Sequence, residues 1–75
     1  MYAVNRMTKS GLWETVTKTE TYAAAVNFAR AILPVIYDEF WIDYEDIEDY
    51  NKEFDEKALT DDLYIEGIIN VEKIA

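Results

Sequence analysis

Apolar and polar residues alternate along the first part of this chain. Residues 2–8 and 12–20 have the alternation and the β-branched content of two strands. The residues between them, Lys9, Ser10 and Gly11, read as a turn, in which Gly11 can supply the positive φ that a tight hairpin needs. The pattern therefore predicts an N-terminal β-hairpin.

A helical period follows the hairpin in an alanine-rich segment. Alanine is the best helix former, and Thr21 stands where an N-cap is expected. Pro34 is predicted to end or kink the helix, because proline cannot donate the backbone hydrogen bond that an interior position requires. These features predict a helix over residues 21–33. Four residues mark its apolar face: Tyr22, Val26, Ala29 and Leu33.

Residues 35–57 separate aromatic from acidic side chains when they are placed on a helix at roughly 100° per residue. The aromatic residues and Ile47 form one arc, and most of the carboxylates form the opposite arc. This separation predicts a second, acidic helix. The alternative is a strand that alternates through Phe40, Ile42 and Tyr44, with an acidic loop after it.

The last apolar segment, residues 63–74, is predicted to be a strand with apolar side chains on both faces. Such a strand fits a central position beside the hairpin, or contact with a second copy of the chain in a homodimer. We therefore expect one α+β domain over residues 1–75, with a three-stranded antiparallel sheet and two helices in the order ββααβ. Trp13 fits either the core or an exposed anchor. The expected core is Val4, Val16, Val26, Phe28, Leu33, Ile47, Ile65, Ile69 and Val71.

The negative charge of the chain is concentrated in one block. Residues 38–62 contain twelve carboxylates and two lysines, a formal charge of −10, whereas residues 1–37 carry +2 and residues 63–75 carry −1. Such a block costs folding free energy through self-repulsion, so a small domain that keeps it is a candidate for binding a basic partner. The same charge repels phosphate, so neither nucleic acid nor a membrane surface is expected as a direct partner.

The composition offers little for catalysis. The chain has no histidine, no cysteine, one serine and two isolated glycines, so we expect no enzyme and no cofactor. The acidic run from Asp43 differs from a calcium-binding EF-hand loop, because Glu48 and Phe54 occupy the positions of its glycine and its last glutamate. We therefore expect no metal site. With no apparent secretory or membrane-spanning segment, a cytoplasmic location is expected.

The carboxylates of the acidic arc, together with two aromatic side chains that could anchor a partner, form the candidate partner-binding site. On a helix the carboxylates of residues 38–62 would follow one another at about 3 Å, close to the spacing of about 3.4 Å between phosphates along one DNA strand. The alternative is an acidic face that is only solvated surface. The candidate residues are Asp38, Glu45, Asp46, Asp49, Glu53, Glu56, Trp41 and Tyr50.

In this acidic block with its interleaved aromatics, and in its short cysteine-free α+β frame, the chain resembles the small acidic inhibitors that phages and other mobile elements use against restriction and CRISPR nucleases. The resemblance is one of character and covers about a third of the chain. It implies a stoichiometric protein–protein inhibitor that occupies the basic nucleic-acid-binding surface of its target as a nucleic-acid mimic. The alternative function is a small structural or protein-interaction module.

Overall fold

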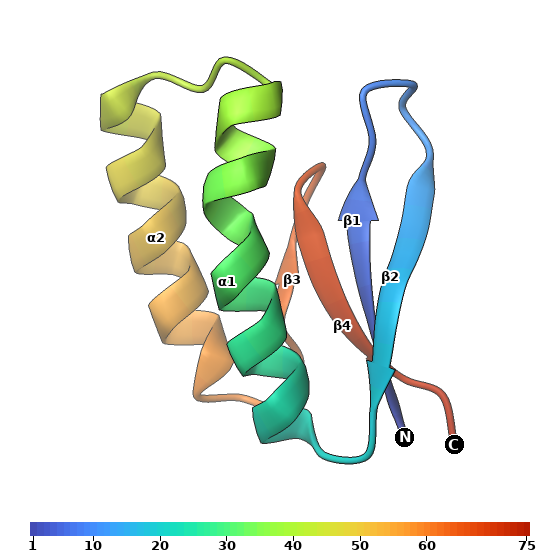
Figure 1. Ribbon diagram of the computed structural model, residues 1–75. Coiled ribbons are helices and arrows are strands. Elements are labelled where there is room, and N and C mark those ends of the chain that lie inside the picture. Colours follow the sequence, from blue (N-terminus) through green and yellow to red (C-terminus); the bar gives the residue numbers. More distant parts are fainter.

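A four-stranded antiparallel sheet and two helices on one of its faces make up the computed structural model, which describes residues 1–75 (Figure 1). The strand order is β2 (Trp13–Thr19), β1 (Tyr2–Met7), β4 (Ile69–Lys73) and β3 (Tyr64–Ile65). The α+β class and the two helices are as predicted, whereas the sheet has four strands instead of three. The helices are α1 (Tyr22–Glu39) and α2 (Tyr44–Ala58).

The predicted N-terminal hairpin is confirmed. Gly11 has a φ of +82°, and its N–H donates to the carbonyl of Thr8 at 3.0 Å to close the turn. On its other edge β1 pairs with β4, with Val4 opposite Val71. The C-terminal strand is therefore central beside the hairpin, which was one of the two positions expected for it.

The single strand predicted over residues 63–74 is instead a second hairpin. Gly67 has a φ of +74° and turns the chain, so that Ile65 pairs with Ile69. The apolar side chains of this segment, including Ile65, Ile69 and Val71, are buried in the core of one chain, so they do not require a second copy to cover them. Homodimerisation stays a prediction, which light scattering over a wide concentration range would test.

The capping prediction for α1 is confirmed, because the Ala24 N–H donates to Thr21 Oγ1 at 3.1 Å. The helix does not end at Pro34 and runs on to Glu39. Its continuation buries Ile36 and Tyr37 in the core, where Tyr37 stacks on Tyr50 of α2. Burying each such side chain contributes about 1.5–3 kcal/mol, which together offsets the cost of about 3 kcal/mol for an interior proline.

The helix predicted over residues 35–57 is also wrong in its boundaries. Residues 35–39 belong to α1, residues 40–43 form a loop, and α2 spans Tyr44–Ala58. The alternative strand through Phe40, Ile42 and Tyr44 does not form. Neither helix has the length and apolar character needed to cross a lipid bilayer.

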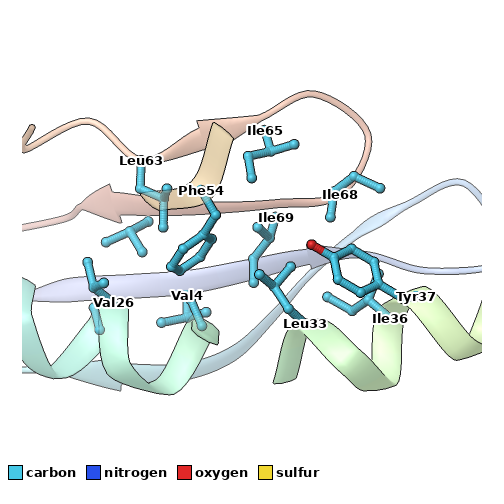
Figure 2. Packing of buried hydrophobic residues seen from close by; sticks show 13 residues of the cluster. Val4, Val26, Leu33, Ile36, Tyr37, Phe54, Leu63, Ile65, Ile68 and Ile69 are labelled. Carbon is cyan, nitrogen blue, oxygen red and sulfur yellow. The ribbon is translucent and has the colours of Figure 1, made fainter. Parts of the chain in front are cut away.

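The core lies between the helices and the sheet, and Phe54 is the one fully buried side chain that α2 contributes. Figure 2 shows its ring extending toward Val4 of the sheet. Phe28 is 38% exposed and the prediction that it is buried is wrong, because it points roughly 140° away from Leu33 around α1. Val16 and Ile47 are only partly buried against the core. The other six predicted core residues are buried: Val4, Val26, Leu33, Ile65, Ile69 and Val71.

Candidate protein-binding surface

The outer side of α2 carries a continuous row of carboxylates. Phe54 and the partly buried Ile47 and Tyr50 turn toward the core and orient the helix. At roughly 100° per residue, five predicted site residues then fall within an arc of about 100° on the other side. All are exposed except Glu53, which is half-buried. We call these residues the acidic face: Glu45, Asp46, Asp49, Glu53 and Glu56.

Most of the carboxylates in residues 38–62 have no cationic partner. Three of the twelve form ion pairs: Glu39 with Arg6, Asp55 with Arg30 at 2.6 Å, and Glu53 with Lys57 at 3.8 Å. The remaining nine have none. The hydrogen bond that Arg6 donates lowers the pKa of Glu39 from its ordinary value of 4.5. The acidic face is therefore largely uncompensated within the chain.

The density of charge along α2 is comparable to that of a nucleic-acid strand. The 15 residues of α2 include seven carboxylates. At about 1.5 Å per residue the helix is about 22 Å long, or about 3 Å per carboxylate, against about 3.4 Å per phosphate on one DNA strand. The spacing expected for the whole block is thus realised only on α2.

The break at residues 40–43 separates Asp38 from the acidic face. Asp38 lies near the end of α1 and is exposed, whereas its neighbour Glu39 is held toward the sheet by Arg6 on β1. The predicted single surface is therefore divided into the acidic face of α2 and a second region around Asp38 and Trp41.

Trp41 closes α1 in a conformation that usually requires glycine. Its N–H donates to the carbonyl of Asp38 at 3.3 Å, and the Ile42 N–H donates to that of Tyr37 at 3.1 Å. These two bonds are those of a Schellman motif, in which the residue after the C-cap is left-handed and most often glycine. Trp41 has a φ of +54° there, at a cost of about 1–2 kcal/mol.

The Trp41 side chain contributes little burial energy to offset this backbone cost, because it is 88% exposed. It stands at the side of an open hollow of about 480 Å³, formed where α1, the loop and α2 meet at the top of Figure 1. Tyr37 OH donates to Asn51 Oδ1 at 2.9 Å across this hollow. The residues that line it include Pro34, Asp38, Trp41, Ile42, Ile47 and Asn51.

Tyr50 is placed differently from Trp41, although both were predicted as anchors. Its ring stacks on that of Tyr37, with centroids 6.1 Å apart and planes at 18°, and it is half-buried. Burial raises the pKa of Tyr37 to about 12. Tyr50 therefore packs α2 on α1 and presents only part of its surface.

Trp13, whose position the sequence left open, lies on the sheet face away from the helices. It is 40% exposed and its ring packs 6.2 Å from that of Tyr64. On the same face Asn5 is buried and donates to Asn70 Oδ1 at 2.8 Å, while Thr15 donates to Asn5 Oδ1 at 2.6 Å. These polar side chains of the sheet face are hydrogen-bonded to one another, and the face lies on the opposite side of the sheet from the acidic face and from the region around Asp38 and Trp41.

The sequence interpretation missed the hollow itself. Pro34, Ile42 and Asn51 gave no sign of lining a site, since the hollow depends on how α1 ends and α2 begins. No group of three or more histidine, cysteine, aspartate or glutamate side chains is arranged to hold a metal ion. In comparisons with known proteins, no family model, no curated protein and no solved structure matches this chain.

Proposed function

We propose that this protein binds a basic nucleic-acid-binding protein through the acidic face of α2 and occupies the surface that nucleic acid would use. The observation that carries the proposal is the row of exposed, mostly unpaired carboxylates on one side of a helix anchored by Phe54. Such a row is a preorganised counter-surface for lysine and arginine, and complementary charge speeds association and selects the partner.

The cost of the charge to the fold supports the same proposal. Two like-charged pairs, Glu45/Asp49 and Asp49/Glu53, stand one turn apart on α2, and each is destabilising by about 0.2–0.5 kcal/mol. Two favourable pairs at the same spacing, Glu48 with Lys52 and Glu53 with Lys57, return a similar amount each. Like-charged neighbours three residues apart, such as Asp46/Asp49 and Glu53/Glu56, remain uncompensated. Folding alone gives no reason for this arrangement, whereas a cationic partner would relieve the repulsion.

The resemblance to anti-restriction and anti-CRISPR inhibitors makes CRISPR and restriction nucleases the first targets to examine. In this proposal the protein is a phage-encoded inhibitor that acts in the cytoplasm. The alternative is a small structural or interaction module in which the acidic face is only solvated. The two differ in one respect: only the inhibitor loses its partner when the acidic face is neutralised.

The test compares two variants with equal net charge. Glu45→Gln/Asp49→Asn/Glu56→Gln neutralises three of the five carboxylates of the acidic face, and a control neutralises three exposed glutamates elsewhere. Both change the formal net charge from −9 to −6. Each protein is immobilised and offered purified nucleases and a bacterial lysate, and bound protein is eluted with duplex DNA. The control positions are Glu14, Glu20 and Glu66.

We expect the native chain and the control to retain a nucleic-acid-binding protein that DNA elutes, and the acidic-face variant to lose it. Binding should weaken steeply as salt rises, because the Debye length falls from about 10 Å at 0.1 M to about 3 Å at 1 M. If the acidic-face variant folds and retains the same partner as strongly as the native chain, the proposal is wrong.

A further inference from the structure

Trp41 and the hollow beside it are not explained by folding. The indole is 88% exposed, and it stands on a left-handed residue where glycine would be more favourable. A large exposed aromatic of this kind is typical of a residue whose contacts are made with a partner. The volume of the hollow, about 480 Å³, falls within the range of occupied binding pockets.

The chemistry of the hollow matches one side chain. Pro34, Ile42 and Ile47 offer an apolar wall for an aliphatic stem, the indole of Trp41 offers an aromatic face, and Asp38 offers a carboxylate with no ion pair. We infer that this hollow receives an arginine side chain of the bound protein, with the guanidinium stacked on Trp41 and donating hydrogen bonds to Asp38. This inference rests on the proposed function, since it names the anchor of the same basic partner.

A protein other than a second copy of this chain is the favoured source of the arginine. This chain has only two arginines, and both are in ion pairs, Arg6 with Glu39 and Arg30 with Asp55. A second copy would have to break one of these pairs to offer a guanidinium. Arginine is favoured over lysine because its planar, weakly hydrated guanidinium stacks on an aromatic ring and pairs with a carboxylate through two hydrogen bonds.

The test uses two blocked peptides of equal charge, acetyl-tetra-arginine amide and acetyl-tetra-lysine amide. The indole N–H signal of Trp41 and the backbone amide signals of residues 38–51 are followed by NMR during each titration. The indole signal is assigned by its absence in Trp41→Gly, in which the amide signals report the preference. We expect the arginine peptide to shift the indole signal with an affinity roughly five-fold higher than that of the lysine peptide. Asp38→Asn should reduce this preference, and Leu59→Ser, at an equally exposed apolar residue beyond α2, should leave it unchanged.

Trp41→Gly should unfold at the same or a higher urea concentration than the native chain, since glycine suits the left-handed position, and yet lose the preference for arginine. A preference that survives in Trp41→Gly would overturn the inference. Equal shifts by both peptides, confined to the α2 amides, would also overturn the inference. That result would leave the acidic-face proposal intact. Conversely, if arginine selects Trp41 but the Glu45→Gln/Asp49→Asn/Glu56→Gln variant still captures the partner, the arginine site stands and the proposed function fails.

Discussion

Phe54→Ala should detach the acidic helix from the fold. Phe54 is 0% exposed and is the only fully buried residue of α2. Removing its ring forfeits a burial contribution of about 1.5–3 kcal/mol and leaves a cavity, which together typically cost about 3–5 kcal/mol. The guanidinium of Arg30, 4.8 Å from the ring centroid, would also lose its contact with the aromatic face.

That loss is large compared with the stability expected of a domain of this size. At about 0.05–0.15 kcal/mol per residue, 75 residues give about 4–11 kcal/mol in total. Urea unfolding followed by circular dichroism measures the change, and hydrogen exchange shows whether α2 opens before the sheet. The amides of α2 should lose protection first, because the strands keep their own core contacts through Val4, Ile65 and Ile69.

A matched substitution separates cavity formation from other effects. Phe54→Leu keeps most of the apolar volume and should cost well under half as much as Phe54→Ala. The reasoning is refuted if Phe54→Ala lowers the free energy of unfolding by less than about 1 kcal/mol, or if the protection of α2 is unchanged while that of the sheet falls.

Three further predictions concern the cap and two titrating groups. Thr21→Ala should destabilise the protein by about 1 kcal/mol in urea unfolding through loss of the α1 cap, and Thr21→Asn should restore most of it. Tyr37→Phe should cost about 0.5–1.5 kcal/mol at neutral pH by removing the hydrogen bond to Asn51. Burial raises the pKa of Tyr37 from 10.0 to about 12, so the stabilising contribution of Tyr37 is complete below pH 10 and is lost as the pH rises through 12. Alkaline unfolding curves should show this loss for the native chain and not for Tyr37→Phe. Arg6 lowers the pKa of Glu39 below 4.5, so the stabilising effect of Glu39 is present above pH 4.5 and disappears as the pH falls through the lowered value. Unfolding curves measured against pH should therefore show Glu39→Gln to be less stable than the native chain near neutrality and equal to it in strong acid.

Single turn and cap residues were sufficient to predict where some of the strands and helices begin or end. Gly11 placed the first turn and Thr21 the start of α1, since both act through bonds within four residues. Gly67 was a comparable signal for the turn between β3 and β4, but the apolar run around it favoured one continuous strand. These features required no knowledge of packing.

The remaining differences arise from contacts distant in sequence. Pro34 does not end α1, because the helix beyond it places Ile36 in the core and packs Tyr37 on Tyr50 of α2. The loop after α1 was not predictable from its residues, since tryptophan stands at position 41 where glycine or asparagine would have marked a helix end.

One part of the candidate site could likewise be predicted from local sequence, and the other part depends on contacts between distant residues. The acidic face of α2 was predicted correctly as a set of residues on one side of a helix, because a helical period is a local property. The separation of Asp38 from that face, and its place beside Trp41 and the hollow, depends on the break between the helices. Residues on one regular element can thus be grouped from sequence, whereas residues at a junction need the structure.

Competition with nucleic acid is the most direct test of the central claim that the acidic face replaces nucleic acid on a basic protein. A fluorescent duplex is bound to the captured partner, and its anisotropy is followed as the native chain or a variant is added. The native chain and Glu14→Gln/Glu20→Gln/Glu66→Gln should displace the duplex with the same midpoint, and Glu45→Gln/Asp49→Asn/Glu56→Gln should require roughly ten-fold more protein, given about 0.2–1 kcal/mol for each exposed ion pair lost. Displacement by the acidic-face variant at the native midpoint, or a ternary complex in which the duplex stays bound, would contradict the account.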